Sequence, residues 1–290
     1  MFRGSIVAII TPFKNGKVDE DTFRELIEFQ LEGGTGAIVP CGTTGESATL
    51  SVEEHHRVID IAVETVNKRV PVIAGTGGNS TQEAIELTRH AKEAGADASL
   101  QVTPYYNKPT QAGLYAHYKA IAKAVPFPQV LYNVPGRTSV NLLPETVVRL
   151  AELSEVVAIK EASGDLAQMA SVVQLAGDKI TLLSGDDNLI LPVLAIGGKG
   201  VVSVVANIVP KDTADIVKAW EDGDIEKATR LFYKLLPLCQ GMFFETNPAP
   251  VKTSLALMGK ITEGLRLPLV PMSETNLEKL KNVLKNYNLI

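Results

Sequence analysis

Lys160 is the residue in this chain whose position most directly suggests chemistry. It ends the apolar run of residues 156–159, which is typical of a buried strand. Desolvation at the end of such a strand disfavours the ammonium form, so some free amine is expected at neutral pH. A free amine attacks a ketone carbonyl to form a Schiff base. The alternative is a strand-end lysine whose stem packs while its head reaches water.

Two further groups with useful chemistry follow the preceding apolar run. Tyr132 ends the run of residues 129–132, and Arg137 lies five residues later on a loop constrained by proline and glycine. A phenol beside an amine can donate and accept the protons of imine formation. An arginine fork binds a carboxylate better than a lysine does. A packed tyrosine and a solvated loop arginine are the alternatives that local context leaves open.

A glycine- and threonine-rich turn, Gly42-Thr43-Thr44-Gly45-Glu46, precedes a predicted helix. Backbone N–H groups in such a turn can face an anion, and two adjacent hydroxyls can pass protons or add donors. The motif alone is weak, because a sequence of this kind is commonly just a turn.

The elements that must position these residues alternate regularly. Apolar runs predict strands at residues 6–10, 36–39, 71–74, 98–102, 129–132, 156–160, 180–183 and 200–204. Amphipathic stretches predict helices at about residues 21–32, 52–67, 81–94, 112–124, 144–153, 166–175, 188–196 and 211–220. Parallel strands need crossover helices, and eight such units predict an α/β fold of the TIM (β/α)8 barrel type. Active sites of such barrels gather at the carboxyl ends of the strands.

Beyond the eighth unit the alternation stops. Three more helices are predicted at residues 224–236, 250–258 and 274–286. We therefore expect a barrel over residues 1–222 and a C-terminal three-helix extension over residues 223–290, packed on the barrel or on a neighbouring subunit.

Composition narrows the class of protein. The 290 residues are 45% hydrophobic and 21% charged, with a formal charge of −5, which is typical of a globular chain and gives no reason to propose nucleic acid or an anionic membrane as a partner. Cys41 and Cys239 form no disulfide pattern, and the start has no signal-peptide layout. A cytoplasmic protein is the expectation.

Two classes of site are disfavoured. His55 and His56 are adjacent and face different ways on a helix, so no metal site is expected. The loop after the seventh strand carries Asp186 and Asp187, which would repel a phosphate group at the place where many barrels bind one.

Four segments together resemble the 4-hydroxy-tetrahydrodipicolinate synthase family, also called the dihydrodipicolinate synthase family. They are residues 42–47 (GTTGES), 132–138 (YNVPGRT), 159–162 (IKEA) and 184–187 (SGDD), and the similarity runs the length of the chain. The wider superfamily comprises pyruvate-dependent, lysine Schiff-base aldolases and lyases, including N-acetylneuraminate lyase.

The resemblance implies a mechanism that needs neither metal nor cofactor. Lys160 would condense with the ketone of pyruvate, and the iminium would lose a proton to give an enamine. The enamine would attack the aldehyde of L-aspartate 4-semialdehyde, whose own amine would then displace Lys160 and close the ring. The product, 4-hydroxy-tetrahydrodipicolinate, starts lysine and diaminopimelate biosynthesis.

The resemblance also implies residue roles. Tyr132, Thr43 and Tyr106 would form a proton relay, with Tyr106 acting in the site of a partner subunit across a dimer contact. A homotetramer, as a dimer of dimers, is the expected assembly.

The resemblance also implies binding partners for the carboxylates of both substrates. Thr44, with backbone near Gly185 and Val202, would hold the carboxylate of pyruvate. Arg137 would hold the carboxylate of the semialdehyde.

Many members of the family are inhibited by L-lysine at a dimer-interface site. The matching positions here are Ser47, Ala48, His55, Asn79, Glu83 and Tyr105. Val52 stands where some inhibited members have histidine, so inhibition is expected but its strength is open. The alternative is that these are ordinary surface residues.

Two rival functions remain. One is another pyruvate-forming lyase, such as N-acetylneuraminate lyase or a keto-deoxy sugar acid aldolase, against which Arg137 argues because a polyhydroxylated substrate calls for hydroxyl-binding residues. The other is a barrel that only binds a keto acid, which the presence of Lys160, Tyr132, Thr43 and Tyr106 disfavours.

Overall fold

Eight parallel strands form the centre of the computed structural model, which describes residues 2–290. They are β1 (Gly4–Ala8), β4 (Ala37–Val39), β5 (Ile73–Gly75), β6 (Ala98–Val102), β7 (Gln129–Asn133), β8 (Val156–Glu161), β9 (Thr181–Ser184) and β10 (Gly200–Ser203). The sheet runs β4-β1-β10-β9-β8-β7-β6-β5, and a parallel bridge from Ile38 to Val72 joins its two ends. The sheet therefore closes on itself, and the predicted TIM barrel is confirmed.

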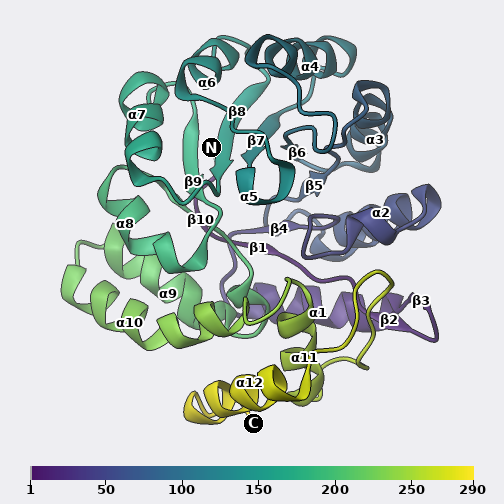
Figure 1. The fold of residues 1–290 in the computed structure, drawn as a ribbon, viewed down its shortest axis with the longest axis vertical. Coiled ribbons are helices and arrows are strands. Elements are labelled where there is room, and N and C mark those ends of the chain that lie inside the picture. The colour runs from purple at the N-terminus through teal and green to yellow at the C-terminus, as the bar shows by residue number, and fades with distance from the viewer. Residues whose placement is uncertain (1) are drawn as a thin grey trace.

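Helices surround this barrel (Figure 1). They are α1 (Glu20–Glu32), α2 (Val52–Val66), α3 (Thr81–Ala94), α4 (Gln111–Ala124), α5 (Pro135–Thr138), α6 (Pro144–Leu150), α7 (Leu166–Ala176), α8 (Ile190–Ala195) and α9 (Pro210–Glu221). Side-chain oxygens of Asp19, Ser51, Ser80, Thr110 and Asp165 cap the N-termini of α1, α2, α3, α4 and α7. Each cap satisfies an amide that the first helical turn leaves without a partner.

The elements differ from those expected at several places, and the short helix α5 was not among the predicted helices. Strand β1 ends two residues early, because the Ile10 amide donates to Asn207 Oδ1 (3.0 Å) and not to a neighbouring strand. The helix expected over residues 188–196 begins as the 3-10 turn η2 (Asp187–Leu189) before α8. A small antiparallel hairpin, β2 (Phe13–Lys14) with β3 (Lys17–Val18), was not predicted because each strand has only two residues.

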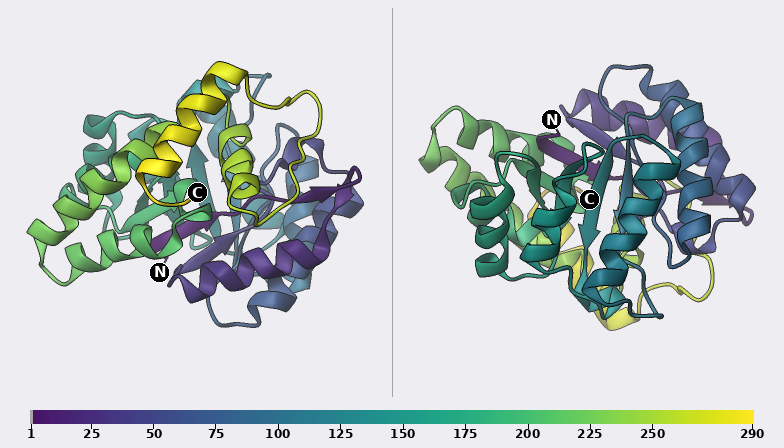
Figure 2. Two further views of the ribbon diagram at one scale, coloured as in Figure 1. Left: turned by 90° about the horizontal axis from the view of Figure 1, so that it is seen from below. Right: turned by 90° about the horizontal axis from the view of Figure 1, so that it is seen from above.

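The C-terminal extension consists of α10 (Ile225–Gly241), α11 (Ala249–Leu257) and α12 (Glu274–Asn286), as expected. Helix α10 packs along α9, and α12 packs on α10 and α11 at the outside of the molecule (Figure 2). Phe232 and Leu235 of α10 share one hydrophobic cluster with Ile208 and Ile216 of the barrel region. The extension is thus packed on the barrel and shares its core.

Alternation along the strands decides which side chains point into the barrel. The interior cluster contains Val130 and Tyr132 of β7 and Ala158 of β8. Because strand side chains alternate in direction, Lys160 points inward like Ala158. Ile159 belongs to the outer cluster between strands and helices, and Glu161 points the same way.

Glycines make the turns that lead from helices into strands. Gly34, Gly95 and Gly197 hold positive φ angles of 80°, 93° and 104° in three of these helix-to-strand turns. Among residues 2–290 no helix is long and apolar enough to cross a membrane.

The strand pair β1–β10 depends on one glycine. Gly200 has φ +152°, and a Cβ there would lie 2.1 Å from the Gly4 carbonyl oxygen. We expect Gly200→Ala to lower the free energy of unfolding by about 2–4 kcal/mol, since both the backbone conformation and the strand contact are lost. Urea denaturation would measure this change. Gly223→Ala is the control, because Gly223 has φ +80° but open space around it; equal losses in the two variants would contradict the steric explanation.

Candidate active site

Lys160 and Tyr132 lie side by side at the carboxyl ends of β8 and β7. They are register partners in the sheet, as the expected order of the strands requires. Lys160 Nζ lies 4.1 Å from the centroid of the Tyr132 ring, and each residue is 6% exposed. No carboxylate of residues 2–290 lies within ion-pair distance of this amine. The amine is therefore buried against an aromatic face, beside a phenol that can exchange protons.

The turn over residues 42–46 follows β4 and faces the same space. Its shape is set by two backbone hydrogen bonds: the Gly45 amide donates to the Gly42 carbonyl, and the Glu46 amide donates to the Thr43 carbonyl. Thr11 Oγ1 donates to the Gly45 carbonyl oxygen at 2.7 Å. Among residues 2–290 the amides of Thr43 and Thr44 have no backbone acceptor, so they remain as donors for an anion.

A residue outside the predicted set, Asn247, connects this turn with Arg137. Its Nδ2 donates to Thr44 Oγ1 at 3.0 Å, and its backbone carbonyl accepts from Arg137 Nη2 at 3.3 Å. The side chain is buried, and Oδ1 has no hydrogen-bond partner within residues 2–290. Asn247 thus positions the hydroxyl of Thr44 and the guanidinium of Arg137 from the segment before α11.

Gly185 leaves room for the Lys160 side chain. A Cβ at Gly185 would lie 2.6 Å from Ala162 Cβ and 3.2 Å from Lys160 Cε. The Gly185 amide already donates to the Glu161 carbonyl (2.7 Å), so Gly185 contributes to the site by leaving room for the Lys160 side chain. Val202 of β10 is buried in the barrel interior cluster, in register with Ile6.

The two aspartates after β9 have different environments. Asp187 is buried, and its Oδ2 accepts from the amides of Val204 and Val205 at 3.0 and 2.9 Å. These two amides follow β10, the place where many barrels bind phosphate. Here both amides already donate to an internal carboxylate. Burial raises the pKa of Asp186 to about 6, although the charge of Lys160 opposes the shift.

Glu161 anchors the end of β8 on the outer side of the barrel. Its carboxylate accepts from Asn133 Nδ2 (3.1 and 3.0 Å), from the Ser163 amide (2.8 Å) and from Gln168 Nε2 (3.1 Å). Burial raises the pKa of this carboxyl group in spite of these donors. The network ties β8 to β7 and α7 and so holds Lys160 in place.

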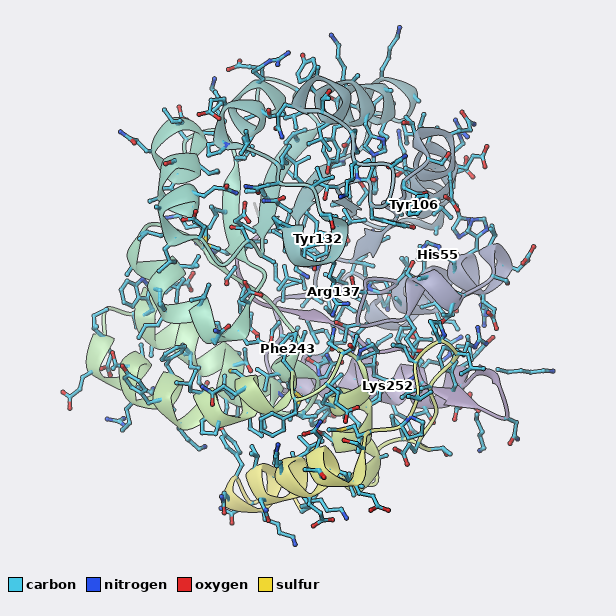
Figure 3. All side chains as sticks on the ribbon, in the orientation of Figure 1. His55, Tyr106, Tyr132, Arg137, Phe243 and Lys252 are labelled. Atoms are coloured by element: carbon cyan, nitrogen blue, oxygen red, sulfur yellow. The ribbon has the colours of Figure 1, made fainter. Side chains whose placement is uncertain are left out.

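A cavity of about 490 Å³ opens beside these groups, although Lys160, Thr44, Gly185 and Val202 are not among its lining residues. Thr43, Tyr132, Arg137 and Asn247 line its inner part, and Figure 3 shows Tyr132 and Arg137 near the middle of the barrel mouth. The same cavity continues to Ser47, Ala48, His55, Glu83 and Tyr105, five of the six positions matched to the lysine site. Asn79 is not among its lining residues; its carbonyl accepts from Asn107 Nδ2 (2.8 Å).

His55 is a buried, neutral acceptor in the outer part. Burial lowers its pKa to about 4. Nε2 lies 2.8 Å from the Gly75 carbonyl oxygen, which can only accept, so Nε2 carries the proton. Nδ1 is buried without a partner among residues 2–290. Close by, burial and the charge of Glu83 raise the pKa of the Tyr105 phenol.

Tyr106 lies away from the other predicted catalytic residues. Its side chain is 90% exposed, its φ is +73°, and it is not among the residues that line the cavity. Figure 3 shows it above His55, on the side of α3. Within one chain, the structure therefore brings Lys160, Tyr132 and Thr43 together and leaves Tyr106 outside.

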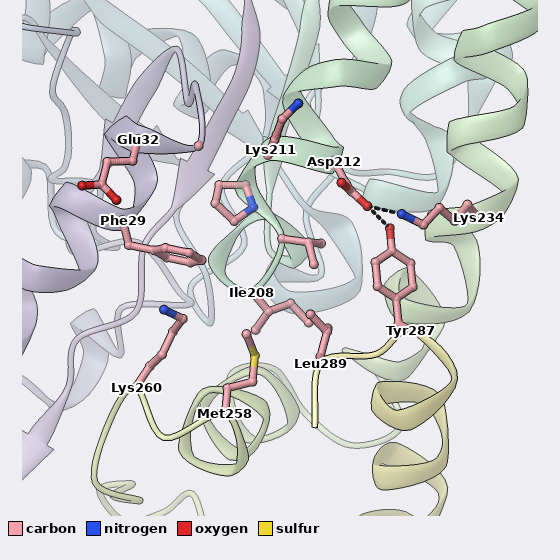
Figure 4. A pocket seen from close by; sticks show the side chains of 13 residues that line it. Phe29, Glu32, Ile208, Lys211, Asp212, Lys234, Met258, Lys260, Tyr287 and Leu289 are labelled. Carbon is pink, nitrogen blue, oxygen red and sulfur yellow. Dashed lines mark hydrogen bonds and ion pairs between the residues drawn. The ribbon is translucent and has the colours of Figure 1, made fainter.

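A second hollow, of about 500 Å³, lies between α1, the start of α9 and the C-terminal helices (Figure 4). Its ammonium groups already have partners: Lys234 pairs with Asp212 (2.6 Å), and Lys260 lies 3.8 Å from the ring centroid of Phe29. In the described part of the chain, no group of three or more His, Cys, Asp or Glu side chains could hold a metal ion. The barrel cavity is therefore the candidate site.

Comparison with known proteins identifies the group to which this chain is related. The sequence profile of the Dihydrodipicolinate synthetase family matches residues 1–287. The chain belongs to this family. A 4-hydroxy-tetrahydrodipicolinate synthase of Geobacter sp. (strain M21) is 63% identical over 290 residues, which is 100% of both chains. The predicted family and enzyme class, a lyase of lysine and diaminopimelate biosynthesis, are confirmed.

Solved structures of family members agree with this assignment. The chloride-inhibited dihydrodipicolinate synthase from Acinetobacter baumannii, complexed with pyruvate, is 49% identical with a TM-score of 0.98, and the match covers 100% of each chain. A family member from Cyanidioschyzon merolae with lysine bound is 40% identical with a TM-score of 0.97, covering 100% of this chain and 99% of that one.

Sequence reasoning missed Asn247 and two charged residues, Glu46 as an ion-pair partner and Lys252. A signal was present for Lys252, which stands in the otherwise uncharged helix α11. An Asn-Pro pair marks the turn at Asn247, but nothing local indicates that it reaches Thr44, 203 residues away.

Gly185 offers a test of how tightly the lysine is positioned. We expect Gly185→Ala to lower kcat/KM roughly 100-fold, because the added methyl group displaces the Lys160 side chain from its place beside Tyr132. Steady-state kinetics would measure this. Gly164→Ala is the control, since Gly164 lies in the loop after β8, the strand of Lys160, at φ +75° and with open space around it. Normal kinetics in Gly185→Ala would show that the site tolerates the displacement.

Proposed function

We propose that Lys160 forms an imine with pyruvate and that the resulting enamine attacks the aldehyde of L-aspartate 4-semialdehyde. The amine of the semialdehyde then displaces Lys160 and closes the ring, which releases 4-hydroxy-tetrahydrodipicolinate. The observation that carries the proposal is the buried Lys160 amine, 4.1 Å from the Tyr132 ring centroid and without a carboxylate partner among residues 2–290. The neighbouring Tyr132 phenol, with Thr43, transfers protons as the carbinolamine loses water. No metal or cofactor takes part in these steps.

The two ends of the substrates have separate binding groups in this proposal. The Thr44 hydroxyl and the amides of Thr43 and Thr44 bind the carboxylate of pyruvate, close to Gly185 and Val202. Arg137 binds the carboxylate of the semialdehyde. Its exposed guanidinium in the cavity wall supports this assignment over the sugar-acid lyases, since it suits a carboxylate and not a chain of hydroxyl groups.

Trapping with borohydride tests the imine directly. With pyruvate present, reduction should add a stable adduct to Lys160, located by peptide mass spectrometry. Lys160→Ala should give no adduct and lose turnover, whereas Tyr132→Phe should slow turnover but still give some adduct, because the amine remains. Near-normal turnover in Lys160→Ala would end the Schiff-base proposal.

The assembly we propose is a homotetramer in which Tyr106 completes the relay of a partner subunit. Its 90% exposed side chain, outside the cavity of its own chain, supports this role. A variant held as a monomer should therefore form the pyruvate adduct on Lys160 but lose most turnover. Analytical ultracentrifugation would establish its state, and full activity in a verified monomer would contradict the role of Tyr106.

Inhibition by L-lysine is proposed for the outer part of the cavity. There the Glu83 carboxylate and the His55 Nδ1 acceptor suit an ammonium group, and Tyr105 lies beside them. Ser47, Ala48 and Asn79 complete the set, and Val52 supplies no imidazole where some inhibited members have histidine. The lysine-bound relative supports the site.

A titration separates this site from the catalytic one. Glu83→Gln should raise the lysine concentration for half-inhibition roughly tenfold, because the charge partner of the ammonium is lost, while turnover without lysine stays unchanged. Full activity of the wild-type protein at millimolar lysine would remove the proposal.

A cytoplasmic location is proposed as well, supported by two free, buried cysteines and testable by cell fractionation.

A further inference from the structure

A second buried lysine lies beneath the catalytic turn. Lys252 of α11 has a side chain that is 1% exposed. Its Nζ donates to the Thr11 carbonyl oxygen at 2.9 Å and to Glu46 Oε1 at 2.5 Å, and it lies 4.1 Å from the ring centroid of Phe13. Figure 3 shows Lys252 on the C-terminal side of the cavity, well apart from Tyr132. This lysine thus has an ionic partner, whereas Lys160 has none among residues 2–290.

Glu46 is held from two separate C-terminal segments. Its Oε2 accepts from the amide of Arg266 at 3.1 Å, while Oε1 accepts from Lys252. The Arg266 side chain in turn makes two bonds to the Glu54 carboxylate, at 2.5 and 2.6 Å. Glu54 belongs to the capping box of α2, so the loop after α11 is fixed both to the turn and to the helix that follows it.

Glu46 is also the last residue of the turn that carries Thr43 and Thr44. Its φ of +54° is unusual for a residue with a side chain, and its amide donates to the Thr43 carbonyl. Thr11 accepts from Lys252 through its carbonyl oxygen and donates through Oγ1 to Gly45. Lys252 therefore contacts both Thr11, which holds the turn through Gly45, and Glu46, which ends it.

Stability alone does not account for this pair. Desolvating two charges commonly costs more than their attraction returns, and burial lowers the pKa of Lys252 despite Glu46. Glu46 also lines the cavity that the substrates must enter. Both proposed substrates carry a carboxylate, so an unpaired Glu46 would repel them.

We propose that Lys252 is a positioning residue for the keto acid: it holds the Thr43–Thr44 turn in its binding geometry and neutralises Glu46 at the cavity wall. This inference rests on the proposed roles of Thr43 and Thr44. The group it serves is a small 2-keto carboxylate. Through Lys252 the C-terminal extension thereby contributes to substrate binding, although Lys252 itself does not contact the substrate.

Two variants test the role. Lys252→Met keeps the length of the side chain and removes the charge. The double variant Glu46→Gln with Lys252→Met leaves no buried charge and keeps an acceptor for the Arg266 amide. We expect both to raise the KM for pyruvate at least about tenfold, with a smaller change in kcat, because the turn is displaced and Lys160 is intact. Borohydride adduct formation should shift to higher pyruvate by the same factor.

The double variant separates positioning from folding. If Lys252→Met has a lowered Tm or fails to fold, the double variant should recover thermal stability, because no charge is left uncompensated, yet keep the raised KM. Recovery of stability together with a wild-type KM would overturn the inference. A wild-type KM in folded Lys252→Met would overturn it equally.

A matched control and the wild-type protein complete the design. Lys281→Met breaks an exposed pair with Glu278 (2.7 Å) on α12 and should leave KM and Tm unchanged. If the wild-type protein gives no pyruvate adduct, the proposed function fails. If it gives the adduct and the double variant keeps a wild-type KM, only the positioning role of Lys252 fails.

Discussion

The burial of the Lys160 amine against an aromatic ring is the constraint on which the rest of the site depends. Lys160 is 6% exposed and Tyr132 is its register partner, so a shift of one residue between β7 and β8 would turn one of the two out of the barrel. The outer network around Glu161 fixes this register from behind. Closure of the barrel then brings the turn after β4 to the same mouth, where Asn247 joins it to Arg137.

Lys160 and Lys252 are both buried lysines bordered by apolar residues, and they have different surroundings. Lys252 meets a carboxylate at 2.5 Å, so its charge is compensated inside the protein. Lys160 meets a phenol ring and a glycine, and its amine has no carboxylate partner among residues 2–290. The chemical difference between them comes from the long-range partner and not from the local run.

The same distinction explains how much of the structure the sequence predicts. Buried parallel strands leave continuous apolar runs, so the barrel, the neighbouring positions of Lys160 and Tyr132 and the C-terminal helices could be predicted. Contacts such as Asn247 with Thr44 span 203 residues, and no local pattern encodes them. Strand ends shifted where a side chain, such as Asn207, replaced the ladder partner of a backbone amide.

The location of the partners of Glu46 has a consequence for the order in which the protein is made. Synthesis proceeds from the N-terminus, so all eight strands of the barrel leave the ribosome before Lys252 and Arg266 exist. Until then the Glu46 side chain has neither its cation nor the Arg266 amide. The nascent barrel can close its sheet, but the keto-acid turn reaches its final surroundings only when the last part of the chain has docked.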